Sequence, residues 1–234
     1  MNKPLIVIFV VLLLSGCTSI KAVFAMMRST EHFVSIKEHP SIKYEKGAES
    51  FARMISPYLD SSMHVIESKQ GRFTAPVEIY VPRSIESFSK YCASERPSAC
   101  VIGHRLFMSP KLLKEKERIP GILTHELSHL QLTQAIGRWN YQTKLPAWFK
   151  EGLAVFVSNG AGAENVDEET AISAIINGKS IRPNGGGGLL IRKTVSSFGL
   201  KPHMFYRQGS MYVRWLYGLD SKYSTNPPHL KSSG

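Results

Sequence analysis

The chain has few cysteines, few acidic residues and only one long apolar run. Its 234 residues include three cysteines, which leaves no second Cys pair for a cysteine-rich zinc site. Aspartate and glutamate number 18 against 29 lysines and arginines, so the formal net charge is +11. Such a surface attracts anionic partners, but the basic residues are scattered and form no long block.

The single long apolar run lies at the start of the chain. It extends from Leu5 to Leu14, follows Lys3 and precedes small residues. The run is shorter than the roughly 20 residues that span a bilayer as a helix. A charged start, a short apolar core and small residues after it are typical of a secretory signal. Because no second run exists, nothing else is expected to cross a membrane.

The end of this leader reads "LSGC", Leu14 to Cys17, which resembles the bacterial lipobox. The resemblance implies a signal peptide at 1–16 and a lipid, such as palmitate, on Cys17. Neither Thr18 nor Ser19 is acidic, which favours the outer membrane, facing the periplasm. An ordinary signal peptide with an incidental cysteine, or an uncleaved anchor, are the alternatives. Export to the cell envelope makes a membrane an expected partner and nucleic acid an unexpected one.

The other two cysteines, Cys92 and Cys100, lie close together in "YCASERPSAC". An export compartment permits disulfides, so we expect a bridge that closes this loop. Two free thiols are the alternative, since spacing alone does not distinguish them.

We expect one domain at 46–219, after a tether with the lipidated cysteine at 17–45 and before a flexible tail at 220–234. Helical spacing covers 47–69, with a break at Pro57, and an alternating strand covers 77–81. A short helix beginning at Ser84 or Ser87 and a strand or hairpin around Gly103 follow. The pattern predicts an α+β fold: a small N-terminal mixed or antiparallel sheet with helices, then a helical half.

Four helices are expected in the second half, at 118–137, 147–160, 166–178 and 202–218, the second of them beginning just after Pro146. Four consecutive glycines, Gly185 to Gly188, form either a flexible lid or a plain linker.

The first of these helices contains "HELSH", with His125, Glu126 and His129. Residues four apart share one helix face, so the two imidazoles can bind one cation. Glu126 lies about 100° further round the helix, where it can reach a water molecule on the metal rather than the metal. The alternative is a buried helix whose histidines are hydrogen-bonded in the core.

A third ligand must come from elsewhere. Leu132 and Ala135 occupy the positions that hold Gly and His in metzincins, which excludes that branch. Glu151 follows on the next expected helix within an apolar run, where an unpaired carboxylate would be costly. A solvent-facing role for Glu151 stays open. The weaker candidate ligands are Glu164, Asp167 and Glu168.

"HELSH" followed by "LPAWFKEGLA" resembles the gluzincin zinc metallopeptidases, and "YRQGSMYVRWL" resembles the Tyr-x-x-Gly helix of their aminopeptidase-type members. The resemblance covers about residues 76–217. It implies a compact thermolysin-like or aminopeptidase-like domain holding one Zn²⁺ through His125, His129 and Glu151. Glu126 is then the general base, and Tyr206 stabilises the oxyanion. A packing role for Tyr206, with Tyr212 in its place, is the alternative.

The resemblance has a limit. The amine-recognising Gly-x-Met-Glu-Asn type motif of true aminopeptidases is absent, because the corresponding stretch reads "CVIGHRLFMSPKLL". His104 in this stretch is expected at the surface, with a substrate contact as the alternative. Aminopeptidase specificity is therefore not implied.

Together these features predict a lipid-anchored zinc peptidase that acts on a protein or peptide of the cell envelope. A non-catalytic zinc-containing scaffold is the main alternative, although a scaffold has no need of Glu126. A membrane-surface binding module driven by the positive charge is the second.

Overall fold

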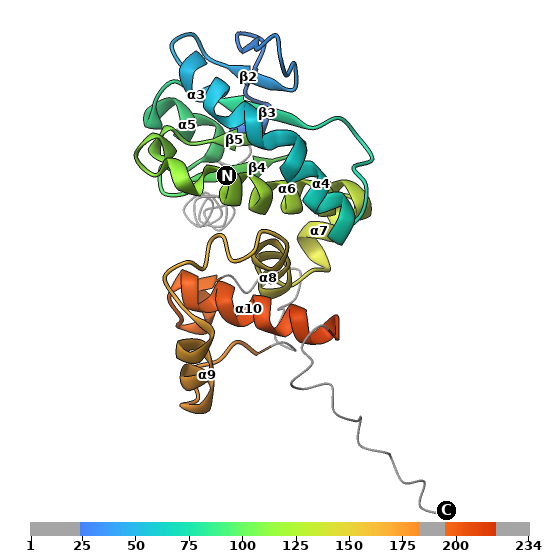
Figure 1. Cartoon of the computed structure of the whole chain (residues 1–234), viewed down its shortest axis with the longest axis vertical. Coiled ribbons are helices and arrows are strands. Elements are labelled where there is room, and N and C mark those ends of the chain that lie inside the picture. Colours follow the sequence, from blue (N-terminus) through green and yellow to red (C-terminus); the bar gives the residue numbers. More distant parts are fainter. Residues whose placement is uncertain (1–23, 183–194, 219–234) are drawn as a thin grey trace, which may run out of the picture.

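A five-stranded sheet and eight α-helices make up the part of the chain that the computed structural model describes, residues 24–182 and 195–218 (Figure 1). The expected α+β class is confirmed. The leader, Cys17, the glycine run and the tail lie outside the described residues. No helix of the described part is long and apolar enough to span a bilayer.

The sheet is mixed, and its strand order is β1-β2-β3-β5-β4. The strands are β1 (Val34–Ser35), β2 (Ile42–Tyr44), β3 (Glu78–Val81), β4 (Ala99–Ile102) and β5 (Arg105–Met108). The two outer pairs, β1–β2 and β4–β5, are antiparallel, whereas β3 pairs parallel to both β2 and β5. Strand β4 is therefore at an edge of the sheet, joined to β5 by a tight turn at Gly103 (φ +67°).

The predicted tether at 17–45 is wrong in its last third. Residues of β1 and β2 belong to the sheet, where Ile42 pairs with Ile79 of β3 and is fully buried. These strands have two and three residues. Runs this short are too brief for an alternating pattern to be recognised in the sequence.

The helices of the first half follow the local signals in the sequence. The break expected at Pro57 is a turn of 3-10 helix, η1 (Ser56–Tyr58), between α3 (Glu49–Ile55) and α4 (Leu59–Lys69). Helix α5 (Ile85–Cys92) begins after Ser84, whose hydroxyl accepts a hydrogen bond from the Ser87 backbone N–H at 3.0 Å. Two short 3-10 helices, η2 (Pro110–Lys114) and η3 (Lys116–Arg118), lead into the second half.

The two faces of the sheet bury different side chains. Ile79 and Leu106 face a large aliphatic core shared with α3, α4 and the later helices. Tyr80 and Phe107 face the opposite side, where their rings stack with centroids 5.1 Å apart in a small aromatic cluster with α5. This alternation follows from the period of two in a strand and places the helical half against the aliphatic face.

The remaining helices follow in the chain. They are α6 (Ile119–Ile136), α7 (Arg138–Thr143), α8 (Ala147–Val157), α9 (Glu168–Ile176), η4 (Val195–Phe198) and α10 (Pro202–Leu216). Helices α8, α9 and α10 form the lower part of Figure 1. Helix α6 lies between the sheet on one side and the α8–α10 pair on the other. Its side chains can therefore meet those of α8 in the interior.

Candidate metal centre

Helix α6 presents both histidines to the interior. It begins with Pro120 in its first turn and ends at Gly137, whose φ of +79° favours glycine. Its apolar residues, including Leu123 and Leu127, are fully buried in the core. This packing fixes the rotation of the helix, so that His125 and His129 turn toward α8 with 5% and 8% of their surfaces exposed.

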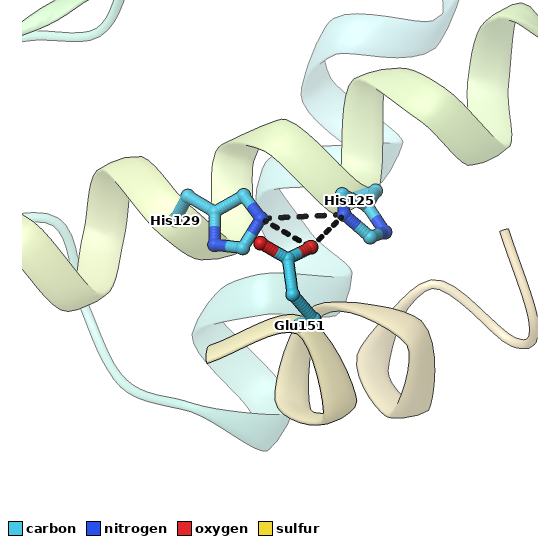
Figure 2. A group of neighbouring side chains, drawn as sticks. All are labelled: His125, His129 and Glu151. Atoms are coloured by element: carbon cyan, nitrogen blue, oxygen red, sulfur yellow. Dashed lines mark hydrogen bonds and ion pairs between the residues drawn. The ribbon is translucent and has the colours of Figure 1, made fainter. Parts of the chain in front are cut away.

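Glu151 of α8 meets the two imidazoles (Figure 2). Its Oε2 lies 3.5 Å from Nε2 of His125 and 3.5 Å from Nε2 of His129, and the two nitrogens are 3.2 Å apart. Ligand atoms about 2.0–2.2 Å from a tetrahedral metal ion are about 3.3–3.6 Å from one another. Two imidazole nitrogens and a carboxylate oxygen thus have the spacing and chemistry of three ligands to one divalent ion.

The hydrogen bonds behind the histidines determine which nitrogens can bind an ion. Nδ1 of His125 lies 2.9 Å from the carbonyl oxygen of Ala161, which can only accept, so Nδ1 carries the proton. Nδ1 of His129 lies 3.1 Å from the Tyr141 hydroxyl, whose oxygen can accept a hydrogen bond from a proton on this Nδ1. Both Nε2 lone pairs then point at Glu151. Metal-binding histidines almost always have such outer partners, which fix the tautomer.

The charges of the two carboxylates differ because of their surroundings. Burial would raise the pKa of Glu151, but the imidazoles of His129 and His125 outweigh it and hold this pKa far below its usual value. Burial raises the pKa of Glu126, although both histidines oppose it. Glu151 is thus the anionic group of the cluster, and Glu126 is the carboxyl group whose proton affinity is increased.

The cluster opens into a cavity of about 610 Å³. One wall is the loop before β4 and the first part of β4 itself, residues 96–101. Glu126, Tyr141 and Tyr206 also line the cavity. The ring of Tyr206, on α10, lies 6.2 Å from the ring of His125 between centroids.

Two glycines bring α8 and α10 close together and so place Glu151 near Tyr206. A Cβ added to Gly152 would lie 2.4 Å from the backbone C and O atoms of Gly209. A Cβ added to Gly209 would lie 2.7 Å from the Trp148 carbonyl oxygen. Real Cβ atoms do not approach backbone this closely, so these two positions need glycine.

A third glycine lies beside the cluster. Gly162 has φ +89°, and a Cβ there would lie 3.1 Å from Cε1 of His125 and 3.4 Å from Cδ2 of Tyr206. Its missing side chain leaves room for both rings. The neighbouring carbonyl of Ala161 is the one that holds His125.

The weaker ligand candidates lie outside the cluster and have other partners. Glu164 pairs with Arg118 at 3.3 Å. Asp167 caps α9 by accepting the Thr170 N–H at 2.7 Å, and Glu168 accepts two hydrogen bonds from Arg214 at 2.6 and 2.7 Å.

Three further predictions concern Tyr212, His104 and the cysteine pair. Tyr212 stacks on Trp215 with ring centroids 5.5 Å apart and does not line the cavity. His104 is exposed in the turn between β4 and β5, as expected. The expected disulfide between Cys92 and Cys100 is present and links α5 to β4.

No sequence pattern identifies the groups that support the cluster. Tyr141, Ala161 and Gly162 lie on a short helix and a loop with no recognisable pattern. The only local sign was the glycine after Glu151 and the glycine three residues after Tyr206. Both glycines belong to the motifs that resemble the gluzincins, and the structure shows what they do physically.

No protein-family model and no curated protein matches the chain. Among solved structures, it is similar to native yeast LTA4 hydrolase, with a TM-score of 0.43 and 14% sequence identity. That match covers 80% of this chain and 30% of the other chain. The proposal below therefore depends on the geometry of the site.

Proposed function

We propose that this chain is a zinc-dependent peptidase that hydrolyses peptide bonds of a protein or peptide in the cell envelope. One observation carries the proposal. His125, His129 and Glu151 present three ligand atoms 3.2–3.5 Å apart, and both Nε2 atoms lie at the same distance from one carboxylate oxygen. Three protein ligands and a cavity beside them are typical of catalytic rather than structural zinc, whose sites are closed by four protein ligands.

A zinc ion held by these residues supplies a water molecule of lowered pKa and polarises the substrate carbonyl. Glu126 lies one residue along α6 from His125 and lines the same cavity. We assign it the general-base role: it takes the proton of the attacking water and passes it to the leaving amine. Burial raises the pKa of Glu126, which strengthens it as a base.

Tyr206 is the proposed oxyanion donor. Burial and the nearby carboxylates of Glu151 and Glu126 raise its pKa, so the hydroxyl keeps its proton at neutral pH. A protonated hydroxyl that lines the cavity can donate a hydrogen bond to negative charge as it develops.

The edge strand supports a peptide as substrate. Among the described residues β4 pairs only with β5, so one of its edges is unpaired there, and its residues 99–101 line the cavity. Unpaired backbone groups of an edge strand can bind an extended peptide by strand addition. A chain held along β4 would pass beside the histidine cluster.

The test is cleavage of a fluorogenic peptide library by the zinc-loaded chain, compared with its Glu126→Gln variant. Glu169→Gln, an exposed substitution on α9, is the matched control. We expect the wild type and the control to cleave, and Glu126→Gln to bind zinc equally well but lose activity by at least 100-fold. Equal cleavage by Glu126→Gln would contradict its role as the general base. Equal biological function of a Glu126→Gln chain that no longer cleaves would support the scaffold alternative instead.

We also propose that Cys17 carries a lipid that anchors the enzyme in the outer membrane, facing the periplasm. The support is the sequence Leu14 to Cys17 and the non-acidic residues after it. Mass spectrometry of the membrane-extracted chain tests it. A lipid on Cys17, absent from Cys17→Ser, is expected. An unmodified Cys17 in the mature protein would contradict it.

A further inference from the structure

The loop between α5 and β4 borders the cavity and is restrained by a disulfide and by hydrogen bonds. The Cys92–Cys100 disulfide joins its two ends. Within the loop, the Ser98 carbonyl accepts the Ser109 backbone N–H at 2.9 Å, and the Arg96 carbonyl accepts a hydrogen bond from Lys111 Nζ at 3.3 Å. The disulfide and these hydrogen bonds therefore restrain the backbone that carries Arg96.

Two neighbouring residues of this loop border different cavities. Arg96 lines the cavity of the histidine cluster, whereas Glu95 lines a separate cavity beside Phe24 and Lys90. The loop thus places Arg96, and not Glu95, beside the candidate active site.

Arg96 also differs from the other arginine of this cavity in its ion pairs with described residues. The other arginine, Arg118, pairs with both Glu115 and Glu164, which neutralise it. Within the described part of the chain no carboxylate pairs with the Arg96 guanidinium, which is exposed. The only carboxylates among the cavity-lining residues are Glu126 and Glu151, which belong to the cluster. An unpaired guanidinium on a fixed loop can bind a carboxylate through two parallel N–H···O hydrogen bonds.

We propose that Arg96 is a specificity residue that binds a carboxylate of the substrate, so that the enzyme favours acidic peptides over neutral ones. The proposal rests on the proposed peptidase function. A peptide extended along β4 would pass Arg96, because residues 96 to 101 form one continuous wall of the cavity. The carboxylate is that of an aspartate or glutamate side chain of the peptide.

Binding to the zinc-loaded Glu126→Gln chain tests this inference without turnover. The probes are fluorescent peptide libraries that place either Glu or Gln at one fixed position and are otherwise identical. A charge-assisted hydrogen bond at a partly exposed site supports a preference of about tenfold for Glu at the best position. We expect Arg96→Ala to abolish this preference, Arg96→Lys to keep part of it and Arg96→Glu to reverse it.

Arg72→Ala is the matched control, since Arg72 is exposed and does not line the cavity. It should leave the Glu preference unchanged. A parent chain that binds both libraries equally, or an Arg96→Ala chain that keeps the preference, would overturn the inference. A preference that falls equally in Arg72→Ala would also overturn it, because it would show a general effect of net charge.

Kinetics separate this inference from the proposed function. With Glu126 restored, Arg96→Ala should raise KM about tenfold for a cleaved Glu-containing peptide and leave kcat unchanged. Cleavage with no Glu preference would contradict the role of Arg96 and leave the peptidase standing. Arg96-dependent binding without cleavage by the wild type would contradict the peptidase and leave the binding role standing.

Discussion

Substitution of Gly152 by alanine is a sharp test of how the site is positioned. The new Cβ would lie 2.4 Å from the Gly209 backbone and 2.9 Å from the Ser210 nitrogen. Neither is the end of a flexible side chain, so α8 and α10 must separate. Alanine gains about 1 kcal/mol over glycine in a helix. Overpacking costs about 1–3 kcal/mol, and contact with backbone puts this case at or above the upper end. The net loss of stability is therefore about 2 kcal/mol or more.

The assay is thermal unfolding of the metal-free chain together with zinc affinity by chelator competition. At about 2–4 °C per kcal/mol for a domain of this size, a loss of about 2 kcal/mol lowers the melting temperature by about 4–8 °C, and a larger loss lowers it further. Zinc should bind more weakly, because Glu151 moves with α8. Ser173→Ala, on the exposed face of α9, controls for helix propensity alone. A melting temperature and zinc affinity in Gly152→Ala as high as those of the wild type would refute the close-crossing explanation.

Three further outcomes are expected. Tyr141→Phe removes the hydroxyl partner of His129 Nδ1 and should weaken zinc binding about tenfold, as measured by chelator competition. Circular dichroism should show little change in the fold. An unchanged zinc affinity would contradict the role of Tyr141 in setting the tautomer of His129. Gly162→Ala should lower the melting temperature and alter the visible spectrum of the cobalt-substituted chain, because its Cβ would press on His125. A spectrum like that of the wild type would contradict the need for glycine beside His125. Burial would raise the pKa of Glu45 above 4.5, but a backbone N–H, a hydroxyl and an imidazole together lower it. The ionised Glu45 therefore stabilises the fold fully above pH 4.5, and this stabilisation is lost as the pH falls through the lower pKa of the folded state. The difference in unfolding free energy between the wild type and Glu45→Gln should shrink in acid. A difference that grows in acid would contradict this sign.

The helices could be predicted because their signals are local. Pro57 and Gly137 interrupt or end helices through their own backbone restrictions, and Ser84 begins one through its own hydroxyl. The pair of histidines was predictable for the same reason, since four residues along a helix is a local distance. The disulfide was also a short-range prediction, between cysteines eight positions apart.

The contacts between distant segments could not be predicted from these patterns. Several acidic residues were candidates for the third ligand, and only the packing of α8 against α6 brings Glu151 to the histidines. The Ala161 carbonyl offers no side-chain signal at all. Strands β1 and β2 are held by their neighbours in the sheet rather than by any pattern of their own.

Zinc content of the purified chain tests the central claim most directly. The wild type and its Glu151→Ala variant would be loaded with zinc, dialysed against a weak chelator and measured by elemental mass spectrometry. We expect one zinc ion per chain in the wild type and loss of most of it in the variant, because two imidazoles alone bind zinc weakly. A wild type that retains no zinc, or a Glu151→Ala chain that retains one full equivalent, would contradict the three-ligand site.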